Sequence, residues 1–387
     1  MLTRMELGQR LRRSRESAGL SQKDAATELG LPRPAISQIE AGKRGVDSLE
    51  LVRLARIYGK PVSWFLEPGT SASPLDMVAN LESFAASDQE LLSRFVRFCE
   101  DYGWIEGQLE TSPASPLPDY GAADDPGDEG EAVRQGEAVA EAERRRLGLG
   151  GICGEAVGGL FDRLGIRISI RYLPACRVRN VFLFHPRVGA AIFANTGCAD
   201  GWLPLTLAAE YGRLLFDRRL GGAIHGVASG DQKSLLDLRS IRARRFASAF
   251  VLPAPELRKA LPFDPGMRLE AGHRLGVPDL LLLQQIFRCP PEALAERWEQ
   301  LGWVRPGLKE RLGAIRLTEW SRKCGGRGKE EEKLDQPYPG RFVRLVFEGC
   351  KRGAVTRERL ASLLDWESGQ AARLMSWLDR CARLDLC

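Results

Sequence analysis

The sequence predicts a mainly helical protein with a compact helical N-terminal domain, a mixed α+β body with a small sheet, and a helical tail. Three observations carry this prediction. Residues 1–68 form a compact run with helical periodicity that ends at Pro68-Gly69. Three short apolar segments between residues 166 and 193 are typical of strands. Apolar residues at helical spacing then dominate to the C-terminus.

Composition sets the class of protein. The chain has 387 residues, which is long enough for two or three domains. Hydrophobic residues make up 44% and charged residues 28%, which excludes a wholly disordered or collagen-like chain. No apolar run approaches the ~20 residues of a spanning helix, and the N-terminus lacks an apolar signal core. We therefore expect a soluble, cytoplasmic protein with no membrane association. The formal net charge of +5 permits nucleic-acid binding without demonstrating it.

Changes in composition divide the chain into six segments. They are a compact helical domain at 1–68, an amphipathic helical connector at 75–108, an acidic flexible linker at 109–131, a second folded body at 132–323, a loop at 324–340 and a helical tail at 341–387. The linker is rich in Ser, Pro, Gly and Asp and has no Lys or Arg between Ser112 and Glu131. Such a composition cannot bury enough apolar area to offset its ordering entropy, so it predicts a solvated tether.

The second body is predicted to mix helices with three strands. The expected helices are 137–146, 156–164, 205–216, 241–250 and 292–301, and the expected strands are 166–170, 181–184 and 190–193. The tail is expected to hold two or three helices. One interpretation makes this tail a packing or dimerisation element, and the other makes it a second DNA-binding surface.

Cysteine and histidine content argues against a cofactor. The nine cysteines are scattered and no two form C-x-x-C, which disfavours a disulfide framework and a cysteine zinc site. Reduced thiols are expected in a cytoplasmic protein. The chain has only three histidines. We expect no bound cofactor.

A helix-turn-helix pattern lies in the N-terminal domain. One helix starts at the N-cap candidate Ser21 and ends at Gly30, where a left-handed conformation allows a tight turn. A second helix follows over 34–40. Its Ile36 and Ile39 are predicted to face the core, which turns the intervening polar residues outward.

These residues resemble the Xre, or phage-repressor-like, helix-turn-helix family over about residues 5–66. The resemblance rests on Leu20-Ser21-Gln22, Ala25 and Leu29-Gly30, followed by Ile36–Arg44. It implies a five-helix domain whose second motif helix enters the major groove of a double-stranded DNA operator. One such domain per chain implies a homodimer on two half-sites, associated with the nucleoid when bound.

Site residues follow from the same resemblance. Carried over by position, the base-edge candidates are Arg33, Pro34, Ser37 and Gln38, and the phosphate candidates are Gln22, Lys43 and Arg44. Pro32 and Pro34 replace hydroxyl residues of many relatives, so some hydrogen bonds to DNA are expected to be absent. The alternative is a helical protein-interaction module with a charged face.

The segment Leu205–Asp217 resembles the metallopeptidase helix of the ImmA/IrrE family, in which His-Glu-x-x-His is embedded in a similar apolar frame. The resemblance extends over about residues 135–255 and includes Ala243–Pro253. It implies an α+β, zincin-like fold. An Xre domain followed by such a domain is a known arrangement.

The family's metal ligands are absent from the matching positions. Ala209 and Arg213 occupy the histidine positions, and Ser240 lies near the position of the third ligand. Only the base position, Glu210, is retained. His225 is close in sequence, but it is one residue where three are needed. We therefore expect no zinc, no catalytic residues and a pseudo-metallopeptidase.

Glu210 and Arg213 are three residues apart on one helix and can form an ion pair. One interpretation of Glu210 is a solvated or paired surface acid. The other is a vestigial pocket that binds a small ligand or a peptide.

The sequence thus predicts a sequence-specific transcriptional regulator whose second body is a sensor or partner-binding module for a protein or small-molecule effector. One rival hypothesis is an active or rearranged metallopeptidase that cleaves a repressor. The other is a toxin–antitoxin or phage-defence protein that acts by binding another protein.

Overall fold

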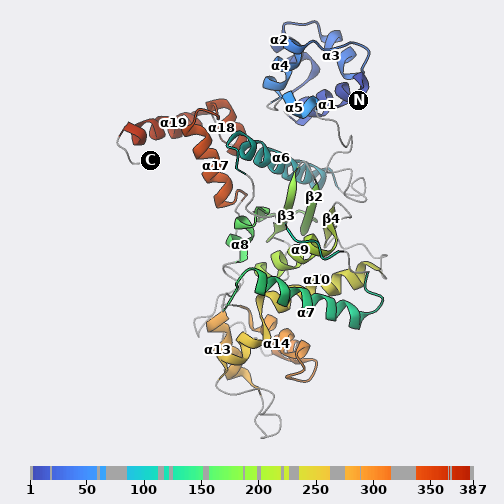
Figure 1. Ribbon diagram of the computed structural model, residues 1–387, viewed down its shortest axis with the longest axis vertical. Helices are drawn as coiled ribbons and strands as arrows, with labels where there is room; N and C mark the ends of the chain where they lie inside the picture. The colour runs from blue at the N-terminus through green and yellow to red at the C-terminus, as the bar shows by residue number, and fades with distance from the viewer. Residues whose placement is uncertain are drawn as a thin grey trace. The chain divides into compact units, whose positions relative to one another are not determined.

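The computed structural model confirms the predicted fold class, with a helical N-terminal region, a small sheet and a helical C-terminal region (Figure 1). The structure describes residues 3–17, 20–58, 62–66, 85–111, 117–121, 125–150, 157–185, 188–197, 202–218, 222–225, 235–261, 275–287, 289–314, 337–364, 366 and 368–383. The chain divides into two compact units. Unit 1 comprises Met1–Met77, Gln89–Thr111 and Arg344–Cys387, and unit 2 comprises Val78–Asp88 and Ser112–Val343.

The N-terminal domain of unit 1 has the five predicted helices. They are α1 (Arg4–Ser17), α2 (Gln22–Leu29), α3 (Arg33–Glu40), α4 (Ser48–Ile57) and α5 (Val62–Leu66). Capping boxes start α2 and α4, because the side chains of Ser21 and Asp47 accept backbone hydrogen bonds at the third helical residue. The helices enclose one core, made of Leu11, Ala25, Ala26, Leu29, Ile36, Ile39, Leu51, Leu54, Ala55, Tyr58 and Phe65.

The remaining helices of unit 1 pack on one another. They are α6 (Ala86–Gln108), α17 (Gly340–Lys351), α18 (Arg357–Leu364) and α19 (Ser368–Arg383). The Arg359 guanidinium donates to Asp101 at 2.7 Å and lies 4.6 Å from the centre of the Trp104 ring. A Cβ on Gly349 would lie 2.7 Å from the Ile105 side chain, so α17 approaches α6 closely. The predicted connector and tail therefore pack against each other, although the sequence analysis placed them in separate segments. Residues 75–84 of that connector, and most of the predicted loop at 324–340, lie outside the described residues.

A four-stranded sheet organises unit 2. Its strands are β1 (Arg167–Arg171), β2 (Asn180–His185), β3 (Gly189–Asn195) and β4 (Gly222–His225), in the order β1-β3-β2-β4. β1 pairs parallel with β3, and β2 pairs antiparallel with β3 and β4. The three predicted strands are confirmed: β1 is shifted by one residue, and β2 and β3 are slightly longer than predicted. Sequence reasoning missed β4, which has four residues and too little apolar alternation to stand out.

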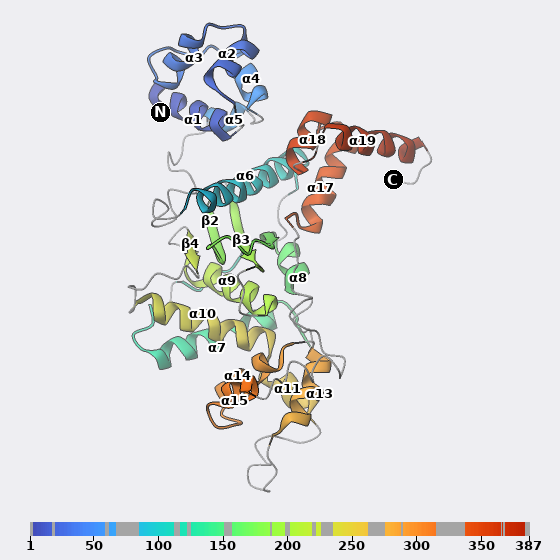
Figure 2. The same cartoon turned by 180° about the vertical axis from the view of Figure 1, so that it is seen from behind.

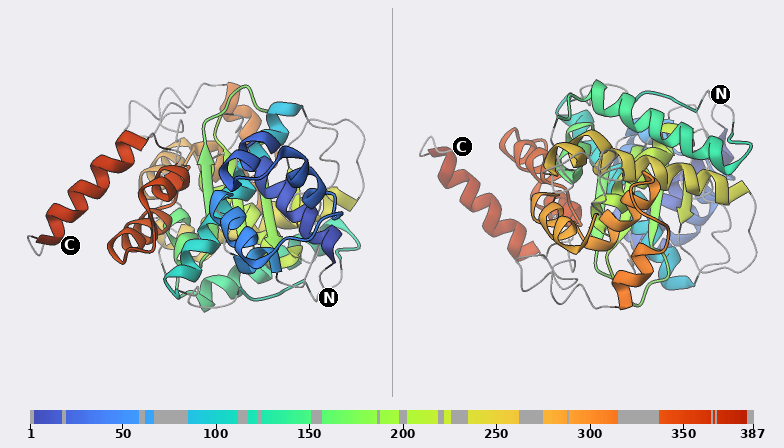
Figure 3. Two further views of the ribbon diagram at one scale, coloured as in Figure 1. Left: turned by 90° about the horizontal axis from the view of Figure 1, so that it is seen from above. Right: turned by 90° about the horizontal axis from the view of Figure 1, so that it is seen from below.

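Eight helices accompany this sheet in the described part of unit 2. They are α7 (Glu129–Arg146), α8 (Val157–Arg163), α9 (Leu203–Phe216), α10 (Leu235–Val251), α11 (Ala254–Ala260), α13 (Val277–Phe287), α14 (Pro291–Gln300) and α15 (Leu308–Ala314). Of these, α8 and α9 pack against the strands of the sheet. Figure 2 shows α11, α13, α14 and α15 gathered together. Figure 3 shows α7 and α10 running side by side. A Cβ on Gly136 of α7 would lie 2.6 Å from the Arg242 carbonyl oxygen of α10, so glycine permits this close crossing.

The segment predicted as an acidic linker at 109–131 differs from a solvated tether in its described residues. Helix α7 begins at Glu129, well before the predicted start at 137. The Asp128 side chain caps it by accepting from the Glu131 amide at 2.7 Å. Pro126 is buried, and Asp125 forms an ion pair with Arg239 of α10. Composition alone could not predict this ion pair, because Arg239 lies far from Asp125 along the chain.

Candidate functional site

The helix-turn-helix is built from local signals. Ser21 Oγ accepts from the Asp24 amide at 3.2 Å, and the Ser21 amide donates to the Asp24 carboxylate at 2.9 Å. This hydrogen bonding with Ser21 lowers the pKa of the exposed Asp24 carboxyl. Gly30 has φ of 69°, and the Leu31 amide donates to the Ala26 carbonyl at 2.9 Å. The chain therefore turns sharply from α2 into α3, as predicted.

Helix α3 presents the base-edge candidates. Ile36 and Ile39 are each 1% exposed and face the core. Pro34, Ser37 and Gln38 are exposed, which confirms the predicted inward and outward faces. Arg33 begins α3, but its side chain lies outside the described part of the chain. The contact of these residues with bases stays a prediction.

The three phosphate candidates have different surroundings. Lys43 is exposed. Arg44 is half-buried, and its guanidinium lies 2.6 Å from the Glu50 carboxylate. Gln22 donates from Nε2 to Glu40 Oε2 at 2.9 Å. Sequence reasoning missed these protein partners of Arg44 and Gln22.

A buried ion pair positions helix α3. The Arg15 guanidinium of α1 contacts both carboxylate oxygens of Glu40 at the end of α3, at 2.6 and 3.0 Å. It also donates to the Leu20 carbonyl at 2.8 Å. Since Gln22 of α2 donates to the same carboxylate, three helices meet at Glu40. Bidentate pairing of this kind fixes orientation as well as distance.

The positions that resemble a metallopeptidase site come together on α9 and α10. Arg213 Nη1 lies 2.7 Å from Glu210 Oε1, which confirms the predicted ion pair. Arg213 Nη2 donates to Ser240 Oγ at 3.5 Å. Glu210 is 0% exposed, so the interpretation as a surface acid is wrong. The apolar frame of α9 carries Glu210 into the interior, and Ala209 is also buried, at 9% exposed.

His225 adds no ligand to this set in the described structure. Its backbone pairs with Asn180 at the end of β4, and its side chain lies outside the described residues. Among the residues that the structure describes, no group of three His, Cys, Asp or Glu side chains is placed to hold a metal ion.

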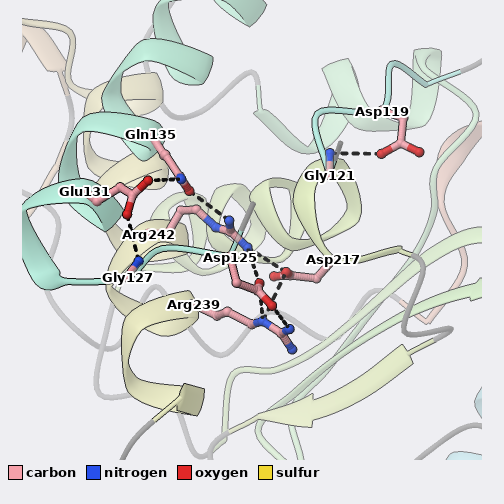
Figure 4. Close-up of polar contacts among 9 residues, drawn as sticks. All are labelled: Asp119, Gly121, Asp125, Gly127, Glu131, Gln135, Asp217, Arg239 and Arg242. Atoms are coloured by element: carbon pink, nitrogen blue, oxygen red, sulfur yellow. Dashed lines mark hydrogen bonds and ion pairs between the residues drawn. The ribbon is translucent and has the colours of Figure 1, made fainter. Parts of the chain in front are cut away.

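A second polar cluster, which sequence reasoning missed, lies at the end of α9 and the start of α10 (Figure 4). Arg242 is 2% exposed and donates to Asp217 at 2.7 Å and to Gln135 at 2.9 Å. Its guanidinium lies 4.4 Å from the centre of the Phe216 ring. Burial raises the pKa of Asp217, against the opposing effect of Arg242. The only signal in the sequence was a pair of arginines three residues apart, which is common on exposed helices.

Glu143 of α7 is the centre of a neighbouring network. Arg146 donates to both of its oxygens, at 2.8 and 2.7 Å, and the hydroxyls of Tyr120 and Tyr211 donate at 2.8 and 2.5 Å. Burial alone would raise the pKa of Glu143, but these hydrogen bonds outweigh burial and lower the pKa. Burial and the bond to Glu143 raise the pKa of Tyr120 to about 12.

Comparison with known proteins identifies the N-terminal domain. Residues 6–62 match a family model described as a helix-turn-helix domain, which supports a DNA-binding regulator. Neither the comparison with curated proteins nor that with solved structures gives a match. The Xre assignment and the ImmA/IrrE resemblance therefore stay predictions. No helix in the described part of the chain is long and apolar enough to cross a membrane.

Proposed function

We propose that the protein is a sequence-specific transcriptional regulator that binds a double-stranded DNA operator through α3. The observation that carries this proposal is the geometry of the helix-turn-helix. Helix α3 exposes Ser37 and Gln38, while the Arg15–Glu40 pair fixes its orientation. Amide and hydroxyl groups can form hydrogen bonds with base edges in the major groove.

The regulator acts as a homodimer in the cytoplasm. One helix-turn-helix domain reads one half-site, so two copies of the chain are needed to read an operator with two half-sites about one helical turn apart. The family match over residues 6–62 supports DNA binding by this domain.

Unit 2 serves as a sensor or partner-binding module and has no peptidase activity. Zinc needs several lone-pair donors in near-tetrahedral array. The methyl group of Ala209 has no lone pair, and the guanidinium of Arg213 is not deprotonated in proteins. Arg213 instead uses its donors on Glu210 and Ser240, at 2.7 and 3.5 Å. Without a bound metal, Glu210 has no acidified water to act on.

The decisive experiment is selection of duplex DNA from a random pool with the full-length protein. We expect enrichment of a sequence with two related half-sites, and a mobility shift with the selected duplex that weakens steeply as salt rises. A protein that retains no duplex at low salt would contradict the proposal.

A further inference from the structure

A short segment of the chain packs against the end of α9 and the start of α10 in unit 2. We define the strap as residues 117–121 and 125–128. Its backbone is held at the C-terminal end of α9: the Tyr120 amide donates to the Leu215 carbonyl at 3.0 Å, and Arg218 donates to the Leu117 carbonyl at 2.8 Å. Backbone hydrogen bonds of this kind hold a peptide with little regard to its sequence.

Two ion pairs show that the surface binds carboxylate side chains of the strap. The Asp119 carboxylate lies 3.0 Å from the Arg218 guanidinium. The Asp125 carboxylate accepts from Nε and Nη2 of Arg239 at 2.9 and 2.5 Å, as Figure 4 shows. Fork-shaped guanidinium contacts select a carboxylate by geometry as well as charge.

Two further contacts show which side chains fit on this surface beside the two aspartates. The Tyr120 hydroxyl donates to Glu143 at 2.8 Å. Gly121 lies so close to the Phe216 carbonyl oxygen that a Cβ at this position would collide with it. The surface therefore fits an aspartate, a tyrosine and a glycine in succession, with a second carboxylate four residues further on.

Part of the receiving surface has partners outside the strap. Arg242 has its own partners in Asp217 and Gln135, and it lies 3.9 Å from the Asp125 carboxylate. Asp217 also lies 3.8 Å from Arg239, whose closer partner is Asp125 of the strap. In contrast, the Asp125 side chain is 48% exposed, and exposed ion pairs contribute little stability. The Asp125 end of the strap is thus held less firmly than Leu117 and Tyr120, which pack against the core of unit 2.

We propose that this surface binds an acidic, extended segment of a partner protein, and that the strap is the chain's own competitor for it. The inference rests on the proposed role of unit 2 as a partner-binding module. It names the chemistry of the partner, which is an Asp-Tyr-Gly run followed by a carboxylate. Binding of the partner displaces the strap from the ends of α9 and α10.

The test uses the full-length chain and a fluorescein-labelled synthetic peptide with the sequence of residues 115–127. A strap-weakened variant, Asp119→Asn with Asp125→Asn, should bind the peptide about tenfold more tightly than the native chain, because the competitor within the chain is weaker. Adding Arg239→Gln to this variant should weaken peptide binding, because the carboxylate of Asp125 in the peptide loses its bidentate partner. Arg145→Gln is the matched control and should change nothing, since Arg145 is 75% exposed and lies elsewhere on α7.

A second variant is designed to displace the strap without changing the net charge of the chain. Gly121→Ala should displace it by collision with Phe216, and should raise peptide affinity in the same direction. Cleavage before Asp119 and Asp125 by an Asp-specific endoprotease should then become faster, as it should when excess peptide is added to the native chain. The thermal midpoint of each variant confirms that it is folded.

Three results would overturn the inference: equal affinity of native and strap-weakened chains, equal binding of a peptide with asparagine at both aspartates, or unchanged affinity after Arg239→Gln. Peptide binding is read by fluorescence anisotropy without DNA. A failure here leaves operator binding standing, and loss of operator binding leaves the peptide result intact.

Discussion

Arg213 Nη1 lies 2.7 Å from Glu210 Oε1 on α9, and both side chains are buried. The two groups are one helical turn apart, and Arg213 also reaches Ser240 of α10. Removing one partner of a buried pair leaves an uncompensated charge. The pair is therefore a structural element whose loss is costly.

Glu210→Gln should lower the free energy of unfolding of unit 2 by about 3–5 kcal/mol, because Arg213 stays buried without its counter-charge. Urea denaturation measures this loss. Glu141→Gln is the control: Glu141 is 69% exposed and pairs with Arg145 at 3.9 Å, so its loss should cost less than about 1 kcal/mol. Equal effects of the two substitutions would show that burial of Glu210 has no energetic consequence.

The purified protein should contain no stoichiometric zinc, as measured by elemental analysis. The double substitution Ala209→His with Arg213→His should bind zinc weakly, because the third ligand is missing. Adding Ser240→Glu should strengthen binding, since Ser240 lies within reach of Arg213 in the native chain. About one zinc per native chain, removed by a chelator together with a peptidase activity, would refute the pseudo-enzyme hypothesis.

Lys43→Ala and Gln38→Ala should weaken operator binding in different ways. Loss of one phosphate contact at Lys43 should reduce the log–log salt slope by about 0.9 and affect all duplexes alike. Loss of a base contact at Gln38 should relax preference at one base pair by roughly 1–3 kcal/mol. Titrations of several duplexes at several salt concentrations separate the two. Arg94→Ala, at a cation that is 66% exposed on α6, is the control and should alter neither quantity.

Stability of unit 2 should depend on pH through Glu143. Its pKa is lowered in the folded protein from the ordinary value of 4.5, so the folded state binds fewer protons than the unfolded state. This contribution is present above the unfolded pKa and is lost as the pH falls through the lower folded pKa. The thermal midpoint of Glu143→Gln should therefore lie below that of the native chain at pH 7 and approach it as the pH falls through the lowered pKa of Glu143. A constant difference across this range would show that Glu143 does not titrate as described.

Local signals in the sequence were enough for the N-terminal domain. The Ser21 cap, the left-handed turn at Gly30 and the inward face of α3 each depend on residues a few positions apart. The three strands of unit 2 were predicted for the same reason, since alternation is visible within one strand. The Glu210–Arg213 pair was also predicted, because it needs only helical spacing.

Only the tertiary structure decided which distant charges meet. The pairs Arg15–Glu40, Arg359–Asp101 and Arg239–Asp125 join residues far apart in the chain. For residues 109–131 the sequence predicted a solvated tether, because composition gives the charge of a segment but not the residues that it contacts. Whether a carboxylate stays in water or binds an arginine depends on where the rest of the chain places that arginine, and folding alone sets that distance.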